Sequence, residues 1–132
     1  MASRPCVYRI QDKDGRGPWK PGFSHKWVED RTDEEYAALP PGGTQFPQLN
    51  CMTFVSDRYY GFGCESLDQL RKWFRRSEYE TLRGYGYRAC KLYVDRILFQ
   101  SDVQVVFERA QPLKVSAKSV SLYPECHANA VI

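Results

Sequence analysis

Long apolar runs are missing from this chain of 132 residues. No stretch approaches the roughly 20 consecutive apolar residues of a membrane-spanning helix, so we expect no transmembrane segment. The opening residues MASRP lead directly into polar sequence without an apolar signal core, which predicts no secretory leader and a cytoplasmic location. A chain of this length has room for one hydrophobic core, which predicts a single domain over residues 1–132.

Metal-binding and nucleotide-binding patterns are also scarce. The five cysteines are scattered without a Cys-x-x-Cys pair, and the only histidines are His25 and His127. Adjacent Cys126 and His127 are poorly placed to ligate one ion, so we predict no metal site and free thiols in a reducing compartment. The sequence has no Walker loop and no Gly-x-Gly-x-x-Gly motif.

Charge of one sign is in small excess, with 19 Lys and Arg against 16 Asp and Glu. A net charge of +3 excludes an acidic DNA mimic and argues against nucleic acid as the main partner. Positive charge concentrates at Arg71, Lys72, Arg75 and Arg76. This run is either the solvated face of a helix or a docking face for an acidic partner or RNA.

The residues that are abundant, 14% aromatics with nine Gly and eight Pro, favour a loop-rich α+β fold. Alternation predicts a first strand over residues 6–10. A long Gly- and Pro-rich loop region follows over residues 15–48, with one or two helical turns after Thr32. Extended segments are predicted at 51–56 and 59–64.

Two short helices are expected in the middle of the chain. Ser66 and Gln69 have the spacing of a capping box, which predicts a helix over residues 67–76. A second box from Ser77 to Glu80 predicts another short helix that stops at Gly84. The remaining sequence alternates with period two, which predicts strands at 87–94, 96–99, 103–107, 113–115 and 120–123.

One sequence pattern points to a known family. Tyr8-Arg9 ends the first predicted strand and is followed by Asp12, Arg16-Gly17-Pro18 and Gly22-Phe23. This order resembles the opening of ADP-ribosyltransferases of the pertussis- and cholera-toxin type. The resemblance implies an ADP-ribosyltransferase-like mixed β core with two short central helices and NAD as the cofactor.

The resemblance also implies roles for individual residues. It assigns Arg9 to the phosphates and ribose region of NAD, a task that suits a planar fork of donors. It places Tyr8, Arg16 and Phe62 beside the cofactor. His25 lies close in sequence to this implied NAD loop. From the residues alone, Arg9 can equally pair with an aspartate in a surface turn.

Two further elements of that family are present in altered form. Where the family has a Ser-Thr-Ser-like strand end before a helix, this chain has Cys64-Glu65-Ser66, and Phe54-Val55-Ser56 is a second match. Ser66 would brace the active site, although a plain helix N-cap also explains it. Where the family has its catalytic glutamate, this chain has Gln104, which carries no charge. Glu108 falls on the same strand face and is a substitute acid.

Two functions follow as hypotheses. The first is an NAD- or ADP-ribose-binding protein with weak or lost mono-ADP-ribosyl transfer to a bacterial protein. The second is a non-catalytic, phage-encoded inhibitor that contacts a host protein, as anti-CRISPR and other anti-defence proteins do. The length and the aromatic-rich composition also resemble those of small phage or prophage proteins.

Overall fold

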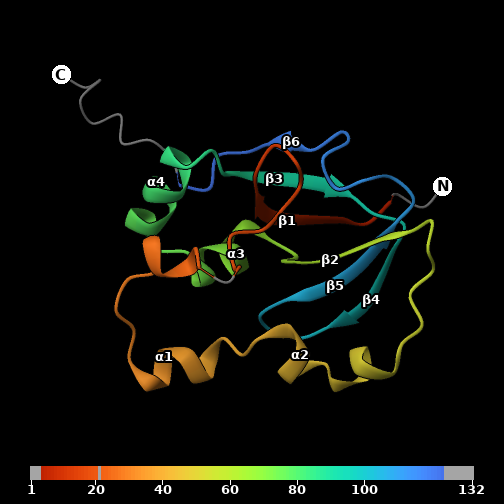
Figure 1. Ribbon diagram of the computed structural model, residues 1–132, viewed down its shortest axis with the longest axis horizontal. Helices are drawn as coiled ribbons and strands as arrows, with labels where there is room; N and C mark the ends of the chain where they lie inside the picture. Colours follow the sequence, from red (N-terminus) through yellow and green to blue (C-terminus); the bar gives the residue numbers. More distant parts are fainter. Residues whose placement is uncertain (1–3, 21, 124–132) are drawn as a thin grey trace.

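Two small sheets and a set of short helices form the structure, a computed structural model that describes residues 4–20 and 22–123 (Figure 1). In chain order the elements are β1 (Cys6–Gln11), η1 (Ser24–Lys26), α1 (Asp33–Ala38), α2 (Gly42–Gln45), η2 (Pro47–Cys51), β2 (Tyr59–Gly63), α3 (Leu67–Trp73), α4 (Arg76–Gly84), β3 (Arg88–Tyr93), β4 (Arg96–Gln100), β5 (Val105–Arg109) and β6 (Lys118–Ser119). The predicted α+β class is confirmed.

The strands pair in two three-stranded sheets. The first has the order β1-β3-β6 and the second the order β2-β5-β4. A bridge between Tyr8 and Cys64 joins β1 to β2, with each backbone N–H donating to the other residue's carbonyl at 2.8 Å. Every strand pair among the described residues is antiparallel, whereas a mixed core was expected.

The first sheet lies between two hydrophobic clusters. One face packs on α3 and α4 through Ile10, Ala89, Leu70 and Leu82. The other face meets the second sheet through a cluster of Val7, Leu92, Val94, Val105 and Phe107. Alternating residues of β1 therefore enter different clusters, as the period-two pattern of a strand buried on both faces requires.

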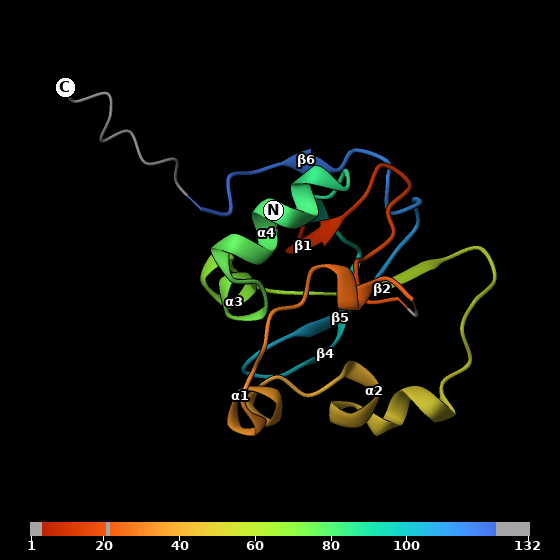
Figure 2. The ribbon, with the colours of Figure 1, turned by 60° about the vertical axis from the view of Figure 1, so that its left-hand side comes forward.

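The Gly- and Pro-rich region contains more structure than a loop. The helical turns predicted after Thr32 are confirmed as α1, because Thr32 and Glu35 form a reciprocal capping box. Below the second sheet, α1, α2 and η2 follow one another in both views (Figures 1 and 2). Residues 51–56, predicted to be extended, form no strand: Cys51 ends η2, Met52 is extended with φ −78° and ψ 144°, and the residues that follow are irregular.

The two short helices predicted in the middle of the chain are confirmed as α3 and α4, although α3 is shorter than its predicted range of 67–76. α3 ends at Trp73, and Phe74 is extended, with φ −134° and ψ 112°. The next helix begins at Arg76, not after Ser77, because the Glu78 carboxylate accepts from the Arg75 backbone N–H at 2.8 Å. The helix predicted to begin after Ser77 therefore begins two residues earlier, with Arg75 and not Ser77 as its N-cap.

The late strands are confirmed at β3, β4 and β5 but not at residues 113–115 and 120–123. The carbonyl of Leu113 accepts from the Gln11 side chain at 2.8 Å, and that of Val115 accepts from Arg109 at 2.9 Å. Side chains of β1 and β5 thus donate to the backbone carbonyls that a neighbouring strand would otherwise have bonded. No described helix is long and apolar enough to cross a membrane.

Candidate functional site

Arg9, the residue that the resemblance assigns to NAD phosphates, lies between the two sheets. Its guanidinium donates from Nη1 to the Phe62 carbonyl at 3.2 Å and from Nη2 to the Gly15 carbonyl at 3.3 Å. The side chain is 9% exposed and sits 5.9 Å from the ring centre of Phe107. Burial lowers the pKa of Arg9 to about 10. Arg9 therefore braces β2 from the inner side of the second sheet.

Gln104, which the expected resemblance matches to the ADP-ribosyltransferase glutamate, lies on the outer face of the second sheet. It precedes β5 and shares a face with Val106, whose partner across the sheet is Phe62. Its Nε2 donates to the Pro40 carbonyl at 2.9 Å and to the Gln45 Oε1 at 2.7 Å. The α2 segment thus covers Gln104, and the sheet separates Gln104 from Arg9.

Glu108 shares the outer face but belongs to an ion-pair cluster. Its Oε1 accepts from Arg96 at 3.0 Å and from Arg58 at 3.2 Å. The hydrogen bond from Arg96 is the main cause that lowers the pKa of Glu108. Glu108 lies four positions after Gln104, about 13 Å along the chain at the usual rise of a strand. The two side chains therefore do not meet at one point.

Ser66 acts as a helix cap in this arrangement. Its Oγ accepts from the Gln69 backbone N–H at 3.0 Å at the start of α3. The Gln69 side chain then accepts from Glu65 and donates to the Asp102 carbonyl, both at 2.8 Å. Ser66 and Gln69 together fix the start of α3 against the turn before β5.

The remaining predicted cofactor residues occupy different places. Tyr8 packs against the helix-side cluster, and Phe62 is 44% exposed beside α2. The Arg16 side chain is exposed on the turn after β1, where its backbone N–H donates to Asp12. The three motif-bearing segments do become neighbours, because β1 bridges β2 and β2 pairs with β5. The side chains do not converge.

Comparison with known proteins identifies the family. The family described as the bacteriophage T4 Y00F protein matches residues 1–121 of the chain. This chain belongs to that family. No curated protein and no solved structure gives a significant match. The expected resemblance to small phage proteins is thus confirmed, and the chain is a small phage protein.

The basic run of this Y00F family member is divided between two helices and largely paired. Arg71, in α3, forms an ion pair with Asp68, and Arg75 pairs with Glu35 at 2.5 Å and with Glu29 at 3.6 Å. Arg76 lies 3.6 Å from Glu80. Only Lys72 of the four has no ion pair among the described residues. The expectation of one continuous basic helix face is therefore wrong.

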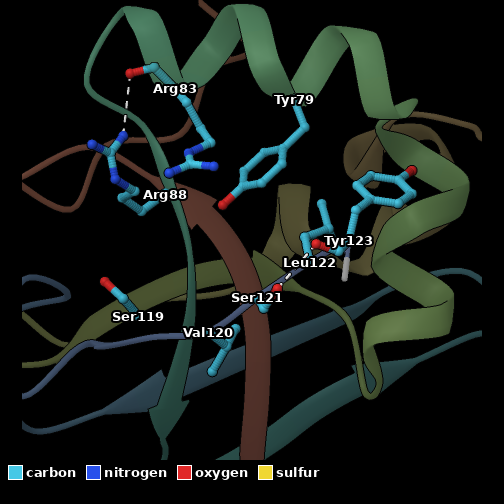
Figure 3. Close-up of a pocket in the computed structure, with 8 residues that line it drawn as sticks. All are labelled: Tyr79, Arg83, Arg88, Ser119, Val120, Ser121, Leu122 and Tyr123. Atoms are coloured by element: carbon cyan, nitrogen blue, oxygen red, sulfur yellow. Dashed lines mark hydrogen bonds between the residues drawn. The ribbon is translucent and has the colours of Figure 1, made fainter. Parts of the chain in front are cut away.

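Unpaired positive charge of this phage protein gathers instead around two hollows beside β3 and β6. The first, of about 270 Å³, lies between α4 and residues 119–123 and includes Arg83 and Arg88 (Figure 3). The second, of about 290 Å³, shares Arg88 and Ser119 with it and includes Lys13 and Lys114. None of these four cations has an ion pair within the described residues.

Several buried polar residues were not predicted from the sequence. Glu78 is fully buried and pairs with Arg31 at 2.7 Å, while Gln11 and Arg109 hold the segment after β5. Their only signal was a polar residue inside an otherwise apolar strand or helix face. His25 is exposed on η1. No three metal-ligating side chains cluster among the described residues, and Cys126 and His127 lie outside them.

Proposed function

We propose that this phage protein acts by binding a bacterial protein and not by transferring ADP-ribose. The observation that carries the proposal is the separation of Arg9 from Gln104 by the second sheet, with both side chains bonded within the chain. Transfer needs a cation and an acid around one ligand, because positive charge builds on the ribose as nicotinamide leaves. An amide at position 104 cannot supply that negative charge.

A surface suited to such contact includes the first residue of β2 and the segment before it. Phe54 and Val55 are 50% and 51% exposed, and Tyr59 is 41% exposed. The segment is braced, because the Val55 N–H donates to the Tyr60 hydroxyl at 3.0 Å and the Phe54 ring lies edge-on to the Tyr60 ring at 4.7 Å. Large apolar side chains held rigidly in solvent are typical of interaction hot spots.

The test is capture of a host protein from a lysate of a susceptible bacterium by the tagged full chain. The double variant Phe54→Ser with Val55→Ser should lose the captured protein. Tyr93→Ser is the matched control, because Tyr93 is 48% exposed on the other sheet. Equal capture by the wild type and the Phe54/Val55 variant would refute this contact surface.

Recognition of NAD or an ADP-ribose-like ligand is the second candidate, on an ADP-ribosyltransferase-like scaffold. One observation favours it: the three motif-bearing segments, far apart in sequence, are neighbouring strands. In this proposal the ligand would lie on the outer face with Phe62 and Gln104. Its polar groups would take over the bonds that Pro40 and Gln45 now accept from Gln104.

A thermal titration separates the two candidates. If NAD binds with a millimolar Kd, ten times that concentration should stabilise the fold by about 1.4 kcal/mol, and Gln104→Leu should remove the effect. Gln48→Leu, an exposed glutamine of η2, is the control. Absence of any shift, or a shift that Gln104→Leu leaves intact, removes this candidate.

A further inference from the structure

The hollow shared by β1, β3 and β6 carries chemistry that neither candidate function uses. It is lined by the end of β1, by Arg88 and Cys90 of β3, and by residues 114–119. The register places Gln11 opposite Arg88 and Cys90 opposite Ser119, so these side chains face the same side of the sheet. We propose that this hollow, which we call the Gln11 hollow, binds a small phosphate ester with a free hydroxyl group, such as a sugar phosphate.

Backbone geometry brings two distant lysines to this hollow. Gly15 has φ +85°, and a Cβ at this position would lie 3.0 Å from both the Leu113 Cβ and the Lys114 backbone nitrogen. The turn after β1 therefore packs directly on the segment after β5. This contact puts Lys13 and Lys114, which are 101 positions apart, on one rim.

Arg88 is held in place for an anion. Its Nη1 donates to the Tyr87 carbonyl at 2.7 Å and to the Arg83 carbonyl at 3.2 Å. These bonds fix the guanidinium, while Nε and Nη2 donate to no described residue. That free edge is the two-donor fork that recognises phosphate and carboxylate oxygens.

The charge balance of the hollow favours a doubly charged ligand. Lys13, Arg88 and Lys114 supply three positive charges, and Asp12 supplies the one carboxylate. The Asp12 Oδ1 already accepts from the backbone N–H groups of Asp14 and Arg16, at 2.9 and 3.0 Å. A phosphate monoester, with close to two charges at pH 7, matches the remaining excess better than one carboxylate does.

Gln11 indicates what the ligand carries beside its phosphate. The side chain is 2% exposed and lines the hollow, and its Nε2 donates to the Leu113 carbonyl. The buried Oε1 has no hydrogen-bond partner among residues 4–20 and 22–123. An orphaned buried acceptor is costly, and a ligand hydroxyl would satisfy it. A hollow of about 290 Å³ has room for a ribose phosphate and little more.

The experiment is calorimetric titration of the full chain with ribose 5-phosphate, inorganic phosphate and ribose. Ribose 5-phosphate should bind saturably, phosphate more weakly and ribose not at all. Lys114→Gln and Arg88→Gln should each weaken the sugar phosphate about tenfold, the loss of one charged hydrogen bond. Lys72→Gln removes an unpaired cation of α3 and should change nothing.

A second variant tests the acceptor separately. Gln11→Leu should bring the affinity for ribose 5-phosphate down to that for inorganic phosphate while leaving phosphate binding unchanged. If this variant misfolds, the exposed Lys114→Gln still decides the question. The proposal is overturned if ribose 5-phosphate does not saturate the wild type, or if Lys72→Gln weakens its binding as much as Lys114→Gln does. It is also overturned if the protein binds the polyanion heparin and ribose 5-phosphate does not displace it.

Discussion

At the scale of single residues, Arg9 is the clearest case of a charge with a structural task. Within the described part of the chain, both of its donated bonds go to backbone carbonyls, and its Nε is buried without a partner. Arg9→Ala leaves two carbonyls and a cavity between the sheets, so we expect a loss of about 2–4 kcal/mol in the free energy of unfolding. Urea denaturation measures it.

The control for Arg9 is Arg16→Ala, which removes an exposed arginine of the neighbouring turn. It should cost less than about 0.5 kcal/mol. Equal losses for the two variants would mean that Arg9 does not brace the sheets.

Glu108 provides a prediction on pH at the same scale. The Arg96 hydrogen bond lowers its folded pKa, so its stabilising contribution is complete above the unfolded value near pH 4.3 and is lost as the pH falls through the lower folded pKa. Glu108→Gln should therefore be less stable than the wild type at pH 7, and the gap should close below about pH 4. Urea midpoints across this range measure it.

Glu34→Gln is the matched control, because Glu34 is exposed on α1 without an ion pair among the described residues. Its gap to the wild type should not vary with pH in the same way. A Glu108→Gln gap that persists unchanged at low pH would contradict the assignment.

At the scale of elements, α2 is fitted to the second sheet through a residue without a side chain. A Cβ at Gly42 would lie 2.0 Å from the Phe62 Cε1. Gly42→Ala should therefore destabilise the fold by about 1–3 kcal/mol, although alanine is the better helix former. In a Phe62→Ala background the same change should cost nothing or stabilise, and a double-mutant cycle measures the coupling. Additive effects would contradict the contact.

The elements also show which parts of the fold the sequence can predict. The helices after Thr32 and Ser66 were predicted correctly because each begins with a local cap, in which the side-chain oxygen accepts from the backbone N–H three residues later. The cap at Arg75 escaped because Glu78 also binds Arg31 and the Glu29 backbone, which belong to another part of the chain. Non-local bonds of this kind leave no periodic pattern.

The candidate site was harder to predict than the elements for the same reason. A strand pattern gives the two faces of β1 but not which element covers each face. The resemblance assigns Arg9 and Gln104 to one NAD site, yet β2 lies between β1 and β5, and the packing of the two sheets puts the two side chains on opposite sides of the second sheet. The Gln11 hollow depends on residues from both ends of the chain.

At the scale of the whole molecule, the six strands of the two sheets have the order β4-β5-β2-β1-β3-β6. The Tyr8–Cys64 bridge joins the two sheets between β2 and β1. The helices α3 and α4 cover one side of the first sheet, and α2 contacts the outer face of the second. Any chemistry shared by Arg9 and Gln104 would have to pass through the second sheet.

Placing the glutamate of ADP-ribosyltransferases at position 104 is the sharpest test of that arrangement. Gln104→Glu replaces an amide by a carboxylate that cannot donate, so the bond to the Pro40 carbonyl is lost and we expect a lower melting temperature. NAD cleavage should stay at the wild-type background, because Arg9 remains between the sheets. Chromatography of released nicotinamide measures cleavage, and Gln48→Glu controls for added charge.

Nicotinamide release that appears in Gln104→Glu and vanishes when Arg9→Lys is added would contradict this expectation. It would mean that the two side chains can meet around one NAD molecule, and the binding-only function would be wrong.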